Sequence, residues 1–204
     1  GHKDMDKNKI LLGIPTNRQI QPLTVLSLLK MIQNTREEVI PILATQGYTI
    51  SENRNYLVAQ ALKNNCTHLM MIDDDMVFPE NTLNQLLFDN KDIVGVVANS
   101  RALPLMPVVE FFDDEELSVA DKLLGKRNIP EQLFTCKAVG GGILIINTKV
   151  FEKMPRPYFG MEIMDTGMTK TGEDSYFCFN ASKVGFEIWC DPTLKINHIG
   201  NYLY

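Results

Sequence analysis

The sequence lacks the features that mark membrane-spanning, secreted and nucleic-acid-binding chains. It has no apolar run of the roughly 20 residues that cross a bilayer. The apolar stretch near its start ends at Pro15, which is too short for a signal peptide. Its formal net charge of −5 is the opposite of the basic excess that binding to a nucleic-acid backbone needs. We therefore expect a cytoplasmic protein whose main partner is not a nucleic acid.

Cysteine is scarce as well, and no two cysteines form a C-x-x-C pair. The chain has four, at Cys66, Cys136, Cys178 and Cys190. This spacing favours reduced, mostly buried thiols over a zinc site. Repeats, low-complexity tracts and linkers are also lacking, and 204 residues suffice to bury about 70% of the unfolded surface. We expect one domain over residues 5–204, with residues 1–4 a remnant of expression.

The first half of the chain alternates between short apolar runs and longer helix-like segments. The apolar runs predict buried strands at residues 9–15, 39–44, 69–72 and 92–98. The intervening periodic segments predict helices at residues 21–33, 52–64 and 79–90. Leu23, Leu26 and Leu29 share one face of the first helix, and Ser51 is the expected N-cap of the second. Buried strands separated by helices predict a mainly parallel sheet covered on both faces.

The second half is less regular. We expect an extended segment, four short strands, three helices and one long loop. The extended segment is residues 104–112, and the strands are 134–139, 142–146, 187–190 and 195–198. The helices are 114–124, 148–154 and 173–184, and the loop is 155–172.

Three consecutive carboxylates, Asp73, Asp74 and Asp75, follow the third predicted strand. Adjacent like charges repel by about 1 kcal/mol at ~4 Å in water and by about 4 kcal/mol at an effective dielectric near 20. At the end of a buried strand this repulsion calls for a positive group, and a divalent cation shared with a phosphate is the simplest one. A solvated turn is the alternative. Ligands gather at the carboxyl ends of parallel strands, the edge to which Thr16 and Asn99 also belong.

Two acids, Glu173 and Asp174, open the predicted helix 173–184. One interpretation is an ordinary helix start, because acids in the first turn complement the helix dipole. The other makes an ionised Asp174 a general base, with Glu173 orienting it or bonding an acceptor hydroxyl.

Three further features have both a structural and a functional interpretation. His198 is either a packed imidazole or a partner of the acids, and a mixed imidazole–carboxylate ligand set favours Mn²⁺ over Mg²⁺. Arg54, like Arg18, is either solvated or placed on the ligand edge to meet a phosphate or a base. The glycines at 140–142 form either a tight turn or a place where backbone approaches a ligand closely.

Taken together, these segments resemble the GT-A glycosyltransferases, in particular the family 2 nucleotide-sugar enzymes. Four blocks match in order: Asn53-Arg54-Asn55 with the apolar positions after it, THLMMIDDDMVFPENTLNQLL, AVGGGILIINTKVFEKM, and GEDSYFCFNASKVGFEIWCDPTLKINHIG. The second resembles the family's DxD segment, and the fourth runs from an acidic helix start to a terminal metal-binding histidine. The resemblance covers residues 9–200.

The resemblance implies an α/β fold of GT-A type. Its mostly parallel central sheet has helices on both faces and a small additional antiparallel element. It also implies transfer of a sugar, of the hexosyltransferase kind, from a nucleoside-diphosphate sugar to a carbohydrate or other hydroxyl acceptor. The implied cofactor is Mn²⁺ or Mg²⁺.

The resemblance further implies roles for single residues. Asp75, Asp73 and His198 would hold the metal, with Asp73 also contacting the ribose or base and Asp74 supporting one of these functions. The remaining donor-binding residues would be Thr16, Arg54, Gly141 and Gly142, and the catalytic residues Asp174 as base with Glu173.

Two other functions remain open at this point. Asp73-x-Asp75-x-Val77 also fits the D-x-D-x-[TV] pattern of haloacid-dehalogenase-like phosphatases, although two strand–helix units precede it here. The second of these functions is that of a non-catalytic module, with the same fold, that binds a nucleotide-sugar.

Overall fold

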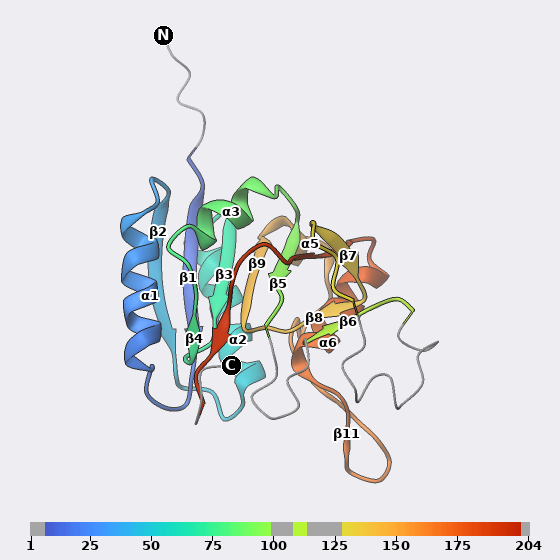
Figure 1. The fold of residues 1–204 in the computed structure, drawn as a ribbon. Helices are drawn as coiled ribbons and strands as arrows, with labels where there is room; N and C mark the ends of the chain where they lie inside the picture. Colours follow the sequence, from blue (N-terminus) through green and yellow to red (C-terminus); the bar gives the residue numbers. More distant parts are fainter. Residues whose placement is uncertain (1–6, 99–107, 114–127, 201–204) are drawn as a thin grey trace.

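The computed structural model describes residues 7–98, 108–113 and 128–200. Asn99, the predicted helix 114–124 and residues 104–107 of the predicted segment 104–112 lie outside these residues. The centre of the described structure is a seven-stranded sheet of order β2-β1-β3-β9-β5-β12-β7 (Figure 1). Its strands are β1 (Lys9–Pro15), β2 (Glu38–Ala44), β3 (His68–Ile72), β5 (Ile93–Val96), β7 (Phe134–Cys136), β9 (Ile143–Asn147) and β12 (Ile188–Asp191).

The sheet is mostly parallel, as predicted. β1 pairs in parallel with both β2 and β3, and β12 pairs in parallel with β5. β9 enters antiparallel between β3 and β5, so those two strands run in the same direction. β7 adds an antiparallel edge next to β12. The carboxyl ends of β1 and β3 therefore lie side by side at one edge, at the bottom of the sheet in Figure 1.

Helices cover both faces of this sheet. They are α1 (Pro22–Gln33), α2 (Ile50–Lys63), α3 (Thr82–Phe88), α5 (Lys149–Lys153) and α6 (Glu173–Lys183). Leu69 and Met71 of β3 belong to the hydrophobic core shared with α2, α5 and α6. Met70 and Ile72 belong to the core shared with α1 and α3. None of the helices in the described part of the chain has the length and apolar character needed to cross a bilayer.

α1 is a helix where predicted, but it does not bury the predicted face. Leu23, Leu26 and Leu29 are 50%, 48% and 56% exposed. The buried residues are instead Thr24, Ser27, Leu28 and Met31. The small side chains of Thr24 and Ser27 permit close packing on the chain after β3, where the backbone N–H of Phe78 donates to Ser27 Oγ at 3.4 Å.

The start of α2 also differs from the prediction. The N-cap is Thr49, not Ser51. Thr49 Oγ1 accepts from the N–H of Glu52 at 3.2 Å, and Glu52 Oε2 accepts from the N–H of Thr49 at 2.9 Å. This reciprocal pair is a capping box, which satisfies two backbone donors at once. The helix therefore begins one residue before Ser51 and carries Arg54 on its second turn.

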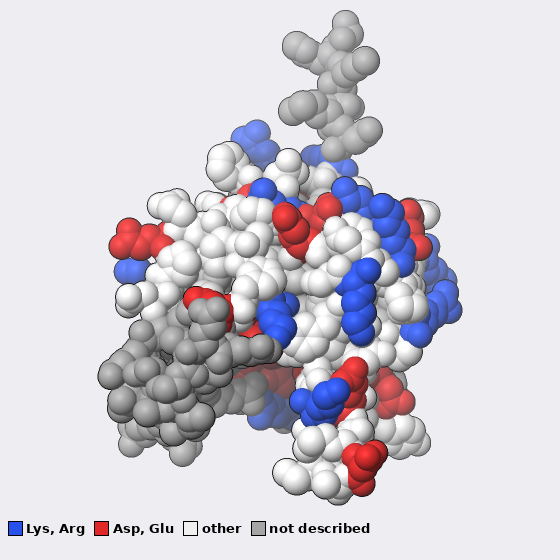
Figure 2. All heavy atoms as spheres, turned by 90° about the vertical axis from the view of Figure 1, so that its right-hand side faces the viewer, with Lys and Arg blue, Asp and Glu red and all other residues white. Residues whose placement is uncertain are grey.

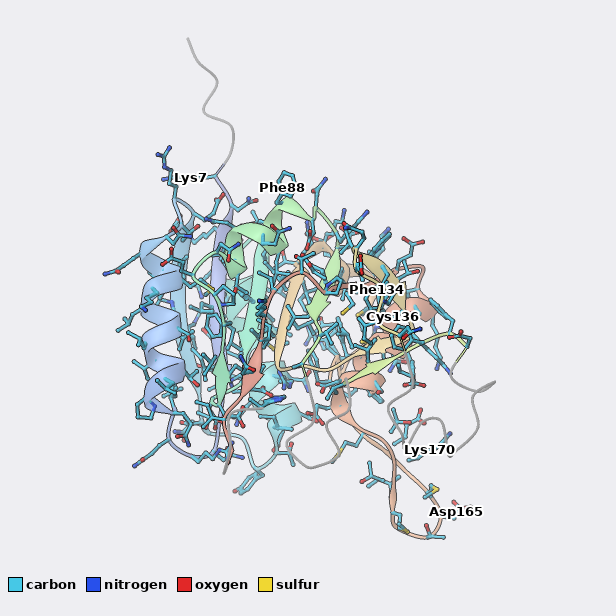
Figure 3. All side chains as sticks on the ribbon, viewed as in Figure 1. Lys7, Phe88, Phe134, Cys136, Asp165 and Lys170 are labelled. Atoms are coloured by element: carbon cyan, nitrogen blue, oxygen red, sulfur yellow. The ribbon has the colours of Figure 1, made fainter. Side chains whose placement is uncertain are left out.

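Three two-stranded antiparallel sheets complete the described fold. They pair β4 (Met76–Val77) with β13 (Asn197–His198), β6 (Val109–Glu110) with β8 (Ala138–Val139), and β10 (Glu162–Ile163) with β11 (Thr169–Thr171). The last pair lies in the segment 155–172, where we had predicted a loop. Its turn includes Gly167 at φ +82°, and Figure 3 shows Asp165 and Lys170 on a hairpin that extends away from the body.

Candidate functional site

The acidic cluster and the loop after β1 form one hydrogen-bonded unit at the carboxyl edge. Thr16 Oγ1 donates to Asp74 Oδ2 at 2.6 Å. The Arg18 guanidinium donates to both Asp74 oxygens at 2.9 Å each and to Asp75 Oδ2 at 3.2 Å. Asp74 and Asp75 are buried, whereas the Arg18 side chain is 55% exposed. In this arrangement, the positive group that the acids require is supplied by arginine.

The block Asn53-Arg54-Asn55 on α2 fixes three different segments around the site. Asn53 bridges two loops, because its amide donates to Asn17 Oδ1 at 3.0 Å and its oxygen accepts from the N–H of Gly47 at 2.8 Å. Asn55 exchanges two hydrogen bonds with the backbone of Phe159, at 2.8 and 2.9 Å. The sequence placed this block on the ligand edge but gave no sign of these anchoring contacts.

Arg54 lies at the centre of the site and is only 2% exposed. Its Nη2 donates to Asp73 Oδ1 at 3.0 Å, and the guanidinium lies 3.9 Å from Asp174 Oδ1 and 4.0 Å from Glu173 Oε1. Among the described residues, Arg54 is thus the cation that three carboxylates share. The three acids come from the end of β3 and the start of α6, far apart in sequence, so their convergence depends on the tertiary fold.

Burial changes the ionisation of Asp73. The pKa of Asp73 is raised to about 6, chiefly because burial disfavours the charged carboxylate, with the Arg54 charge acting in the opposite direction. A carboxyl with this pKa exchanges a proton near neutral pH. A bound cation would favour its ionised form.

The glycines before β9 pass close to these charged groups. The N–H of Asp73 donates to the carbonyl of Gly142 at 2.9 Å. A Cβ on Gly141 would collide with Asp174 Oδ1 and come within 2.8 Å of Arg54 Nη2. A Cβ on Gly142 would lie 3.1 Å from Met76 and 3.7 Å from Nε2 of His198. The absence of side chains here leaves room between the acids and the histidine.

His198 returns to the acidic cluster from the end of the chain. β13 pairs with β4, immediately after Asp75, and the N–H of Ile199 donates to the Asp75 carbonyl at 2.8 Å. His198, Asp73 and Asp174 line one cavity of about 90 Å³, which Gly140, Gly141 and Gly142 also border. The fold thus brings together the predicted imidazole, strand-end acid and helix-start acid.

The predicted metal ligands suit a divalent cation in chemical type. Carboxylate oxygens and an imidazole nitrogen are ligands that Mn²⁺ accepts, and His198 and Asp73 share a cavity wall. Within the described residues, however, no three His, Cys, Asp or Glu side chains converge as a metal-binding group. Arg18 and Arg54 contact the carboxylates of Asp75 and Asp73 instead. The donor types fit the ion, and binding it would require both Asp75 and Asp73 to leave their arginines.

A wider pocket opens beside the small cavity. Its volume is about 470 Å³, within the range typical of small-molecule sites. It is lined by Pro15, Thr16, Asn17, Arg18, Ile50, Arg54, Asp73, Asp74 and Glu173. Asp73 belongs to both spaces, so the two adjoin at this residue. Glu173 faces this wider pocket, whereas Asp174 faces the small cavity.

A larger space, of about 560 Å³, lies at the opposite edge of the sheet, before the starts of β1, β5 and β12. Both lysines that line it are engaged with neighbouring side chains. Lys149 Nζ is 2.9 Å from Asp92 Oδ1, and Lys91 Nζ lies 4.0 Å from the centre of the Trp189 ring. This space includes none of the predicted site residues, so the candidate site is the carboxyl edge.

The overall fold is that of several solved structures. A197 from STIV has a TM-score of 0.60 at 18% identity, over 94% of this chain and 86% of that chain. HddC from Yersinia pseudotuberculosis has a TM-score of 0.53 at 9% identity, over 94% and 93% of the two chains. Mannose-1-phosphate geranyltransferase from Thermus thermophilus has a TM-score of 0.52 at 12% identity, over 94% and 76%. At these identities the likeness establishes a shared fold. No protein-family model and no curated protein sequence matches the chain.

Proposed function

We propose that the protein is a metal-dependent glycosyltransferase that moves a sugar from a nucleoside-diphosphate sugar to an acceptor hydroxyl. The observation that carries this proposal is the junction at Asp73. On one side lies a pocket of about 470 Å³ with two arginines, and on the other a glycine-walled cavity with Asp174 and His198. A nucleoside diphosphate suits the first space, and the transferred sugar's reacting carbon suits the second.

In this proposal Asp174 is the general base. The acceptor's hydroxyl proton passes to an Asp174 carboxylate oxygen while the acceptor oxygen bonds to the anomeric carbon. The bond from that carbon to the phosphate oxygen breaks, and the nucleoside diphosphate leaves with the electron pair. The Asp174 side chain is 28% exposed, and its buried Oδ1 lies 3.9 Å from Arg54, so the carboxylate keeps an accessible part that can accept a proton.

Asp75, Asp73 and His198 would hold the metal ion. A divalent cation, when bound, would neutralise the charge that develops on the departing diphosphate. The chain's own residues position the donor: Thr16 and Asp74 fix the loop after β1, Arg54 orients Asp73, and Gly141 and Gly142 give the sugar room against the backbone.

A transferase that acts on a sugar phosphate is the second candidate. It is favoured by the fold shared with mannose-1-phosphate geranyltransferase, and HddC has been crystallised with GMP-PN. Such an enzyme would transfer a nucleotidyl group from a nucleoside triphosphate to a sugar 1-phosphate and release pyrophosphate. Sugar transfer instead releases a nucleoside diphosphate.

One experiment separates the candidates. UDP, GDP, their hexose conjugates, and UTP or GTP with a hexose 1-phosphate are titrated against the protein with excess Mn²⁺. The melting temperature is followed first, and the released products are then identified. At a concentration of about 100 times the dissociation constant, a ligand adds about 2.7 kcal/mol of stability. We expect stabilisation by a nucleoside diphosphate and slow donor hydrolysis that requires the metal. Stabilisation only by nucleoside triphosphates, with pyrophosphate release from a triphosphate and a sugar 1-phosphate, would support the second candidate.

Arg18 gives a prediction about metal affinity. Its guanidinium is 55% exposed and lies 3.2 Å from the buried Asp75 carboxylate, and because water screens the arginine, we take this contact to be worth about 1 kcal/mol. Because the metal must displace this contact, we expect Arg18→Gln to raise the affinity for Mn²⁺ by up to about fivefold. The measurement is the electron paramagnetic resonance signal of free Mn²⁺ during titration, with exposed Arg36→Gln as the control. Unchanged or weaker Mn²⁺ binding in Arg18→Gln would show that Arg18 and the metal do not compete.

A further inference from the structure

A third cavity adjoins the site on the side away from the nucleotide pocket. Its volume is about 250 Å³. It shares Asp174, Val108 and Gly140 with the small glycine-walled cavity. Its other lining residues are Val109, Glu110, Ala138, Val139 and Ser175, from β6, β8 and the first turn of α6. The three spaces therefore follow one another, with Asp73 at the first junction and Asp174 at the second.

We propose that this third cavity binds the acceptor, and that Glu110 selects an uncharged or positively charged polyhydroxyl compound over a phosphorylated one. This inference rests on the proposed function and adds the chemical class of the acceptor. Its basis is the position of the cavity against Asp174, together with the charge of the groups that line it.

Among the described residues, the charged side chains that line the cavity are both carboxylates. Asp174 faces it from α6 and Glu110 from β6. Two cations of the described chain lie close to them but outside the lining: Arg54 is buried beside Asp174, and Lys137 Nζ is 3.6 Å from Glu110 Oε1 in a pair that is more than a third exposed. Water screens such an exposed pair, so Lys137 offsets the Glu110 charge only in part. A phosphate in this cavity would meet two like charges.

The hydrogen-bonding groups of the lining point to the same class of acceptor. The N–H of Val108 is bonded to the Ala98 carbonyl at 2.8 Å, and the N–H of Gly140 to the Val108 carbonyl at 3.0 Å. With these two backbone donors used, the described lining offers the Ser175 hydroxyl as a side-chain donor and two carboxylates as acceptors, so a ligand that supplies donors fits best. Hydroxyl and ammonium groups do so, and a phosphate dianion does not.

The remaining wall is apolar. Val108, Val109, Ala138 and Val139 contribute aliphatic surface, and Ser175 contributes a hydroxyl group at the α6 end. A sugar ring has an apolar C–H face and a rim of hydroxyl donors, which matches a cavity lined by aliphatic side chains and two carboxylates. One hydroxyl of such a ring would be directed at Asp174.

The test compares transfer to uncharged and phosphorylated forms of the same sugars. The probes are the methyl glycosides of glucose, mannose and galactose and the 6-phosphates of these sugars, each with a UDP- or GDP-hexose and Mn²⁺. We expect the wild-type protein to transfer to an uncharged glycoside. In Glu110→Lys, KM for that acceptor should rise about tenfold and the discrimination against its 6-phosphate should shrink or reverse. Glu110→Gln removes the charge with the shape kept, and should weaken the discrimination without reversing it.

Matched measurements separate this inference from the proposed function. Glu80→Lys makes the same charge change at an exposed residue far from the cavity and should behave as wild type. The affinity for the nucleoside diphosphate is measured in every variant. Two results overturn the acceptor assignment alone. One is that the protein transfers to none of the uncharged glycosides, and the other is that both Glu110 variants leave the preference between uncharged and phosphorylated sugars unchanged. Failure of any nucleoside diphosphate to bind overturns the proposed function, and the assignment with it.

Discussion

Asp174→Asn is expected to lower the rate of sugar transfer about a thousandfold, the middle of the range that a positioned general base contributes. The substitution keeps the shape of the side chain and removes its ability to take a proton. Asp174 Oδ1 is buried, and Arg54 Nη2 lies 3.9 Å from it. The nucleotide pocket is not lined by Asp174, so the dissociation constant of the nucleoside diphosphate should change little. The measurement is kcat at saturating donor and acceptor, with nucleotide binding followed in parallel.

Asp165→Asn is the matched control for this prediction. Asp165 lies on the hairpin between β10 and β11, away from the body of the protein (Figure 3). Its substitution removes the same charge as Asp174→Asn does. The control should keep wild-type kcat. The competing interpretation treats Asp174 only as a favourable acid at the start of α6, worth less than about 1 kcal/mol of stability. If that interpretation is correct, the melting temperature of Asp174→Asn is slightly lower than that of the wild type, and the variant transfers sugar at the normal rate.

The sequence predicts the elements of this fold more reliably than the contacts between them. Buried strands β1 and β3 are continuous apolar runs, and their pattern identifies both their position and their parallel packing. The periodicity of α1 identifies a helix, but the leucines that reveal it are half exposed. Close packing of α1 on its neighbours requires small side chains, so Thr24 and Ser27 are buried instead. Hydrophobicity alone cannot distinguish a buried stripe from an exposed one when both faces are largely apolar.

For the candidate site, too, the sequence predicts where residues lie better than it predicts which residues they contact. That Thr16 and the acids after β3 would share an edge follows from the parallel order of the strands. The partners of the acids do not follow from it, because Arg18 meets Asp74 across 56 positions and Arg54 meets Asp73 across 19. The sequence led us to expect a metal as the compensating charge, whereas the described contacts are with arginines. Glu110 was missed because a single acid in an irregular segment has no pattern, and its place follows only from the pairing of β6 with β8.

The net charge of the chain does not show which arginines belong to the candidate site. The net charge of −5 excludes a generally basic chain, and Figure 2 shows basic and acidic side chains interspersed over the face it presents. The arginines that matter for the candidate site are Arg18, at the mouth of the pocket, and Arg54, which is buried. Composition counts the two equally, although only the second is shielded from solvent.

Arg54→Met is expected to cost about 3 kcal/mol of unfolding free energy, because removing one partner of a buried ion pair leaves its opposite charges uncompensated. Methionine keeps much of the aliphatic volume, so the loss reports mainly the guanidinium. The side chains of Asp73, Glu173 and Asp174 are between 22% and 28% exposed and would then repel one another with no cation between them. The measurement is urea unfolding, with Arg36→Met as the exposed control, which should change stability by less than about 0.5 kcal/mol.

The pH dependence of this loss has a definite sign. In the wild-type protein the pKa of Asp73 is raised to about 6, first by burial, while Arg54 lowers it. A carboxyl whose pKa is higher in the folded state than in the unfolded state favours folding as long as it is protonated. This contribution is complete below the unfolded-state pKa of about 4 and is lost as the pH rises through about 6. Without Arg54 the pKa of Asp73 rises further, so the variant should lose more stability between about pH 5 and pH 8 than the wild type does. Adding Asp73→Asn to Arg54→Met should recover part of the loss at the higher pH, because one of the three carboxylates then carries no charge. An equal deficit at both pH values, with no recovery in the double variant, would mean that Arg54 stabilises the fold by packing rather than by its charge.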